Sequence, residues 1–127
     1  MTGFLTNIEE ATQKNINFRQ VIYTGQHAQI VLMHLNPGEE IGMEVHTVTD
    51  QFIRVESGEG KVIMNDEESS IKDGSAFLIP AGTNHNVVNT SADKPMKLYT
   101  IYSPPHHRDG VVHKTKSDAE ADRTDFL

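Results

Sequence analysis

Two side chains of the kind that bind metal ions stand two residues apart near the middle of the chain. Glu44 offers a carboxylate and His46 an imidazole, groups suited to hard and borderline divalent cations. Because residues two apart on a β-strand point to the same face, both groups would converge on one interior point if that face looked into a barrel. Gln51 follows a predicted bend at residues 48–50, so the next strand can bring its side-chain oxygen alongside.

A further histidine follows a tight turn. Pro80 and Gly82 are strong turn residues, and His85 comes shortly after them, at the start of a predicted strand. An imidazole placed where a strand leaves a turn can reach the same interior as side chains from other strands.

These groups lie in segments that resemble the paired motifs of the cupin superfamily. Residues 38–58, GEEIGMEVHTVTDQFIRVESG, resemble the first motif, with Glu44 where a histidine is usual and Gln51 where a glutamate is usual. Residues 74–89, GSAFLIPAGTNHNVVN, resemble the second motif without departure. The resemblance implies an all-β fold, a cupin jelly-roll barrel or double-stranded β-helix, with a single domain over residues 1–127.

The resemblance also implies one divalent metal ion, Mn, Fe, Ni or Zn, inside the barrel. By position, its ligands would be Glu44, His46, Gln51 and His85. Such a set retains two imidazoles and one carboxylate, a content that suits Fe(II) and Mn(II). Asp50 is a rival for Gln51, but six residues separate Gln51 from Gly58, which is the usual spacing of the motif and favours Gln51.

Small single-domain cupins of this kind are described as mannose-6-phosphate isomerase-like, which implies a metal-dependent sugar isomerase that transfers a proton beside the metal. The same ligand set would also suit a dioxygenase or a carbon–carbon lyase. A non-catalytic module that binds or senses a small ligand stays open as a third interpretation. Similarity of fold does not choose among these reactions.

Other residues could assist a reaction at the metal. His34 and Tyr99 are candidates for a nearby acid or base. Arg19 and Arg54 could anchor a substrate anion, because a guanidinium suits carboxylate and phosphate. Arg54 is the weaker of the two arginines, since it faces outward if Gln51 faces inward.

The C-terminal segment, residues 103–127, carries His106, His107 and His113. These histidines suggest a second site, but no acidic residue stands at ligand spacing, so we favour a solvent-exposed loop. Another interpretation is that the loop folds over the barrel mouth or over a partner subunit. A capping-box pattern at residues 117–120 predicts a short helix in this tail.

The rest of the chain must supply the strands that position these groups. Short runs rich in β-branched and aromatic residues are separated by Gly, Pro, Asn and Asp turns, at the spacing of a β-sandwich or barrel. No long helical pattern interrupts them, and residues 8–14 give only a weak helical signal. The predicted strands cover residues 18–23, 29–35, 42–48, 51–55, 61–64, 70–71, 76–79, 86–89 and 96–102.

Composition narrows the functional classes. The 127 residues fit one domain, and a net charge of -7 argues against a nucleic-acid partner. The absence of cysteine excludes disulfides and zinc–thiolate sites. No stretch is apolar enough to span a membrane, so we expect a cytoplasmic protein that binds a small molecule. The lean apolar content of 36% favours a homodimer, which buries additional surface.

Overall fold

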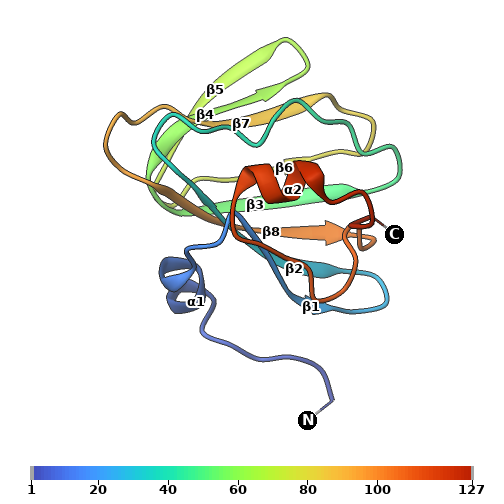
Figure 1. Cartoon of the computed structure of the whole chain (residues 1–127). Helices are drawn as coiled ribbons and strands as arrows, with labels where there is room; N and C mark the ends of the chain where they lie inside the picture. Colours follow the sequence, from blue (N-terminus) through green and yellow to red (C-terminus); the bar gives the residue numbers. More distant parts are fainter. Residues whose placement is uncertain (1, 127) are drawn as a thin grey trace.

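The strands form the two walls of a barrel (Figure 1). The computed structural model describes residues 2–126, which contain nine strands, all paired antiparallel, and two short helices. The larger sheet has the order β6 (Ala76–Ile79), β3 (Asp50–Ser57), β8 (Met96–Ser103), β2 (Gln29–Leu35), β1 (Arg19–Thr24) and β9 (Val112–His113). The smaller sheet has the order β5 (Glu67–Lys72), β4 (Glu59–Met64) and β7 (His85–Asn89). The fold is the all-β, single-domain jelly roll that the sequence predicts.

Alternation along each strand decides which side chains enter the barrel. In β8, Met96, Leu98, Thr100 and Tyr102 are buried, whereas the residues between them are more exposed. Successive side chains on a strand point to opposite faces, so the even-numbered residues of β8 face the interior. The neighbouring strands contribute the other core side chains, which include Val31, Met33, Leu35, Ile53, Val55, Val62, Ile79 and Val87.

The prediction of a regular strand at residues 42–48 is wrong. Gly42 has a φ of +112°, in a region that L side chains rarely adopt, and this interrupts the extended backbone. The segment nevertheless runs along the edge of β7 and makes isolated antiparallel bridges, one of which joins Glu44 to His85. Two reciprocal backbone hydrogen bonds of 2.8 Å hold these two residues side by side.

Helix α1 (Ile8–Lys14) confirms the weak helical signal near the N-terminus. Asn7 caps it, because the Asn7 side chain accepts a hydrogen bond from the backbone N–H of Glu10. Contacts of the helix with β8, β3 and β2 place it against the outside of the larger sheet. None of the helices within residues 2–126 is long and apolar enough to cross a bilayer.

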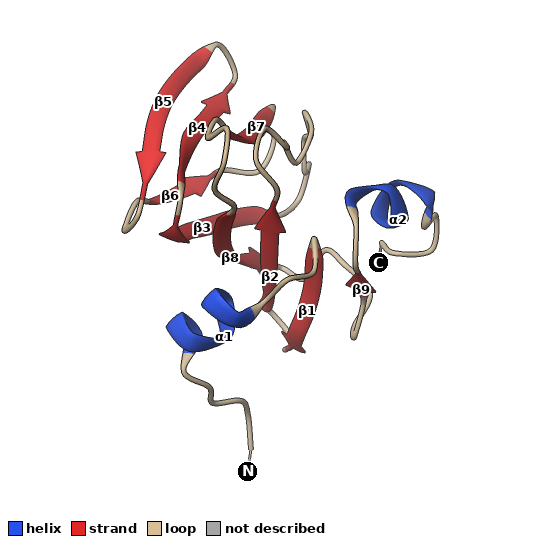
Figure 2. Cartoon of the chain, turned by 60° about the vertical axis from the view of Figure 1, so that its left-hand side comes forward, coloured by secondary structure: helices blue, strands red, loops and turns tan. Residues whose placement is uncertain are grey.

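Helix α2 (Lys116–Ala121) begins earlier than the capping-box pattern predicts. Thr115, and not Ser117, is the N-cap, since its hydroxyl accepts a hydrogen bond from the backbone N–H of Asp118. Figure 2 shows α2 and β9 beyond β1, at the free edge of the larger sheet. The tail is therefore attached to the barrel through its own short strand.

The prediction of a solvent-exposed loop for the C-terminal histidines is wrong. His107 and His113 are only 1% and 4% exposed, and the Nε2 atom of His106 is also buried. The segment turns back against the barrel, where β9 pairs with β1 and an isolated bridge joins His107 to Phe126. The structure supports the interpretation in which this loop folds over the barrel.

Candidate metal centre

Three of the four residues predicted as ligands form one cluster inside the barrel. Ligand atoms of Glu44, His46 and His85 all lie within 4.8 Å of one another. The backbone bridge between Glu44 and His85 holds two of them together, and His46 stands two residues further along the same segment. Nitrogen and oxygen donors lie about 2.0–2.2 Å from a bound zinc ion, so this spacing is close to what one shared ion requires.

Gln51 lies beside this cluster with its side-chain oxygen free. The residue is 3% exposed, and its Oε1 is buried without a hydrogen-bond partner among residues 2–126. Its amide nitrogen donates to the hydroxyl of Tyr102 at 3.3 Å, and its side chain lies near the ring of His46, whose pKa it influences. The contact with Tyr102 fixes the orientation of the amide and leaves the oxygen as the available donor for a cation.

The ring of His85 is oriented by the turn that precedes it. Its Nδ1 lies 2.9 Å from the backbone carbonyl oxygen of Thr83. A carbonyl can only accept, so Nδ1 carries the hydrogen and Nε2 keeps its lone pair. In histidines that bind metals, a hydrogen bond from the ring nitrogen that does not face the metal fixes the tautomer in this way.

Burial keeps the imidazole of His46 in the state that binds cations. Burial, followed by the neighbouring His106 and His85, lowers the pKa of His46 to about 4, so the ring is neutral near pH 7. Burial raises the pKa of Glu44, although Arg19 and His85 oppose this change. Arg19 compensates the half-buried carboxylate only in part, since the pKa of Glu44 is still raised, and a divalent cation would add to this compensation.

The donor groups therefore fit a metal ion. The Nε2 of His46 and the Oε1 of Gln51 are both buried, and neither has a hydrogen-bond partner in the described part of the chain. Buried polar atoms without partners are uncommon in folded proteins. Two imidazoles, one carboxylate and one amide oxygen are a donor set that suits Fe(II), Mn(II) and similar ions.

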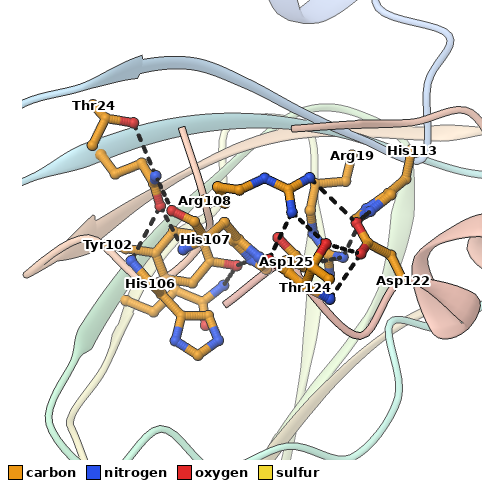
Figure 3. Close-up of polar contacts among 12 residues, drawn as sticks. Arg19, Thr24, Tyr102, His106, His107, Arg108, His113, Asp122, Thr124 and Asp125 are labelled. Atoms are coloured by element: carbon orange, nitrogen blue, oxygen red, sulfur yellow. Dashed lines mark hydrogen bonds and ion pairs between the residues drawn. The ribbon is translucent and has the colours of Figure 1, made fainter. Parts of the chain in front are cut away.

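A buried polar network connects this cluster to the C-terminal segment (Figure 3). The hydroxyl of Tyr102, which accepts from Gln51, lies 3.2 Å from Nε2 of His107. Nδ1 of His107 lies 2.9 Å from Oδ2 of Asp125, and Arg19 lies 3.6 Å from the same oxygen. Burial would raise the pKa of Asp125, but the hydrogen bond from His107 and the nearby positive charges outweigh it and lower that pKa.

The network extends to the third C-terminal histidine. Nδ1 of His113 lies 3.4 Å from the guanidinium of Arg19, and its Nε2 lies 2.9 Å from Oδ2 of Asp122. Both ring nitrogens of His107 and of His113 are thus engaged by protein groups. Neither histidine is free to bind a metal ion, so the separate second site that these residues suggest does not form around them.

His106 is the residue that motif spacing missed. Its ring centroid lies 4.1 Å from that of His46 and 5.5 Å from that of Tyr102. Its Nε2 is buried and has no partner within residues 2–126. Burial, and then the neighbouring His107, lower the pKa of His106 to about 4. Among the interpretations of the sequence, only the one in which the C-terminal loop folds over the barrel places His106 near the cluster.

The structure does not bring His34 and Tyr99 to the cluster. The ring nitrogens of His34 lie 3.3 Å from the carbonyl oxygen of Asn15 and 3.2 Å from Oδ1 of Asn36. Tyr99 packs beside Phe52, on the face of β8 opposite to the buried residues. Both candidates lie outside the barrel because they are out of phase with the core residues of their strands.

A surface pocket beside the C-terminal segment reaches one residue of the cluster, Glu44. It has a volume of about 330 Å³, and Glu44 is part of its wall. Arg19 and Lys116 also line it, so two basic groups stand near the carboxylate of the cluster. Arg54, the other arginine considered as an anion anchor, lies elsewhere and pairs with Glu56 at 2.7 Å.

Comparison with known families gives one match over the barrel. The model of the family described as "Cupin domain", Cupin_2, matches residues 31–102. That range includes all four residues predicted as ligands and ends just before the C-terminal segment. Cupins are built on the same jelly-roll barrel.

Three similar proteins extend the likeness beyond the barrel. The uncharacterized protein YrkC of Bacillus subtilis is 48% identical over 124 residues, which cover 93% of this chain and 66% of YrkC. The uncharacterized protein L612 of Acanthamoeba polyphaga mimivirus is 41% identical over 112 residues, which cover 86% of this chain and 70% of L612. The crystal structure of BH2720 from Bacillus halodurans has 47% identity, a TM-score of 0.91 and coverage of 94% of both chains.

Proposed function

The chain belongs to the cupin domain family, and we propose that it is a metal-dependent enzyme acting on a small oxygen-bearing substrate. The observation that carries this proposal is the cluster of Glu44, His46 and His85, whose donor atoms lie within 4.8 Å of one another in the barrel interior. The free Oε1 of Gln51 supports a fourth donor at the same place. One divalent ion, Mn, Fe, Ni or Zn, is the cofactor proposed for this set.

The roles of these side chains follow from their positions. The imidazoles of His46 and His85 would provide nitrogen donors, and Glu44 would offset part of the positive charge. Gln51, held by Tyr102, would contribute an oxygen without adding charge. An ion in this site supplies a Lewis acid that can polarise a substrate oxygen or activate water or dioxygen. Four donors leave room for substrate on a six-coordinate ion.

The pocket beside Glu44 has room for a small substrate. Its volume of about 330 Å³ lies at the lower end of the range for pockets that bind small molecules. Arg19 and Lys116 line it together with the carboxylates of Glu44 and Glu120, so a substrate with a carboxylate or phosphate could pair only with the two basic groups. Arg19 is also held by Asp125, so its guanidinium is fixed in position before a substrate arrives.

The choice of reaction depends on which groups can move a proton. A sugar isomerase of the mannose-6-phosphate isomerase-like kind needs an acid or base beside the metal, and His34 and Tyr99 face outward. Their positions give that reaction no support. The donor set itself supports reactions in which the metal provides the reactivity, so we favour a dioxygenase or a lyase over an isomerase.

The test is to compare metal-free protein with protein reloaded separately with Mn, Fe, Ni or Zn, on a panel of sugar phosphates and small diketones. Dioxygen consumption would be recorded with each substrate. We expect turnover with at least one metal, lost in Glu44→Gln and kept in His27→Ala, which alters an exposed histidine. The proposal fails if metal removal changes neither turnover nor ligand affinity. A change in ligand affinity without turnover would indicate the non-catalytic binding module.

The homodimer and the cytoplasmic location stay predictions. Exposed apolar side chains gather in the segment that carries the ligands, where Met43, Val45 and Val48 are 58%, 47% and 75% exposed. Apolar side chains exposed together favour burial against another surface. Size-exclusion chromatography with light scattering measures the mass in solution and tests the dimer directly.

A further inference from the structure

We propose that His106 is an additional metal donor, supplied to the barrel by the C-terminal segment. This inference rests on the proposed metal centre and extends it beyond the four residues that the motifs predict. It also makes residues 103–126 part of the site, whereas the family match ends at residue 102.

The first argument is the position of the His106 ring. It lies 4.1 Å from the ring of His46, closer than the 5.0 Å that separates His46 from His85. It also stacks on Tyr102, with an angle of 29° between the ring planes. Tyr102 is the residue that orients Gln51. His106 thus contacts one residue of the cluster and the group that positions another. The donor atoms within 4.8 Å of one another are those of Glu44, His46 and His85, so donation by His106 requires its ring to turn toward them.

The second argument is the difference between His106 and its neighbours. Both ring nitrogens of His107 and of His113 have protein partners. The Nε2 of His106 is equally buried and has none in the described part of the chain. It shares this state with Nε2 of His46 and Oε1 of Gln51. Three unpartnered buried donors on neighbouring side chains are explained together by one shared ligand.

The third argument is that the backbone holds His106 in place. The backbone N–H groups of His106 and His107 both donate to Oε1 of Gln29, at 3.1 and 2.9 Å. The Gln29 amide nitrogen in turn donates to the carbonyl oxygen of His107 at 2.7 Å. Gln29 is fully buried in β2. Its side chain therefore fixes the segment to β2, and Figure 3 shows His106 beside Tyr102 and His107.

A purely structural role for His106 is the alternative. The ring also lies 5.1 Å from Phe126, so it could serve only as packing between that residue and the barrel. Packing predicts that loss of the imidazole lowers stability equally with and without metal. A donor role predicts that the loss appears mainly when metal is bound. With His106 as a fifth donor, a six-coordinate ion keeps one open position for substrate, whereas four donors leave two.

The experiment uses Ni²⁺ alone as the probe on chelator-treated protein. Calorimetry would give its Kd for the parent, for His106→Ala and for His27→Ala as the matched control. Loss of a residue that merely supports a ligand lowers metal affinity about 10–100-fold, so we expect a weakening of at least about 10-fold in His106→Ala. The control should bind as the parent does. X-ray absorption should count three imidazoles on Ni²⁺ in the parent and two in the variant.

Thermal unfolding separates the donor from the packing role. We expect Ni²⁺ to raise the Tm of the parent clearly and that of His106→Ala much less, while the two metal-free proteins unfold at similar temperatures. His106→Gln fills most of the space of the ring and guards against a variant that does not fold. An unchanged Kd and an unchanged imidazole count in both variants overturn the inference and leave the proposed function standing. A parent that binds no Ni²⁺ overturns both.

Discussion

Two groups of buried histidines stand next to each other in this barrel and differ in their hydrogen-bond partners. His107 and His113 bind Asp125, Asp122, Arg19 and Tyr102 through both ring nitrogens. His46 and His106 each keep an Nε2 that is buried and has no partner in the described chain. Burial of a ring nitrogen therefore does not separate the two groups, whereas the presence or absence of a protein partner does, because buried polar atoms normally have one.

Among the substitutions near His107 and His113, removal of Asp125 should cause the largest loss of stability. The carboxylate is 1% exposed and holds both His107 and Arg19. Breaking a buried pair leaves the remaining charge without compensation, so we expect Asp125→Ala to lose about 3 kcal/mol of unfolding free energy. Urea unfolding with chelator present measures this loss. Asp109→Ala, an exposed change in the same segment, should cost little, and an equal loss in both would contradict the assignment.

Removal of His85 should instead lower metal affinity strongly and stability only slightly. His85→Gln takes an imidazole from the cluster, and we expect metal affinity to fall at least about 100-fold, since loss of supporting groups alone costs 10–100-fold. The metal-free protein should lose about 1 kcal/mol or less. Calorimetry with Ni²⁺ and urea unfolding measure the two quantities. Stability lost to the same extent as in Asp125→Ala, with affinity intact, would make His85 a structural residue.

Tyr102 belongs to both groups, because its hydroxyl contacts Gln51 on one side and His107 on the other. Tyr102→Phe should therefore lower both the stability of the protein and its affinity for metal. Leaving two buried groups unpaired should cost about 2 kcal/mol of stability, and release of the Gln51 amide should lower metal affinity about 10-fold. Tyr99→Phe is the control, on the opposite face of β8. An effect on stability without any effect on affinity would separate the two groups.

The smallest change in stability is expected when the pH is lowered. Burial lowers the pKa of His106 to about 4, whereas a histidine in the unfolded chain titrates near 6.5. The unfolded state therefore binds more protons between these values, and the folded state loses stability as the pH falls from about 6.5 towards 4.

Replacement of His106 tests this pH dependence. In metal-free protein, we expect His106→Gln to remove about 1 kcal/mol of the stability loss between pH 7 and pH 5. Urea midpoints across this range give the comparison, with His27→Gln as control. Identical pH profiles for parent and His106→Gln would show that the His106 ring titrates as an ordinary exposed histidine.

The barrel and the cluster of Glu44, His46 and His85 could be predicted because their signals are local. Alternation in β8 and the turns around His85 follow from neighbouring residues, and the spacing of Glu44 and His46 places both on one side of a short segment. The strand predicted at residues 42–48 failed because Gly42 takes a positive φ. Its pairing with β7 survives as isolated bridges, and these are enough to position Glu44.

The C-terminal histidines could not be predicted because their partners are distant in sequence. His107 finds Asp125 eighteen residues later, and His113 finds Arg19 ninety-four residues earlier. A search for an acidic residue close in sequence therefore misses Asp125, and it does not look for a basic partner such as Arg19. Side-chain anchors of this kind depend on where β9 joins the sheet, and a two-residue strand gives too little periodicity to be recognised.

The clamp made by Gln29 has a consequence for the order in which the protein is made. Ribosomes synthesise proteins from the N-terminus, so Gln29 and the barrel strands emerge before the segment that carries His106 and Asp125. During that interval, the amide of Gln29 has not yet met the backbone of His106 and His107. The C-terminal segment can therefore be fixed to β2 only after residues 106 and 107 have emerged, and until then the buried Gln29 amide lacks these partners.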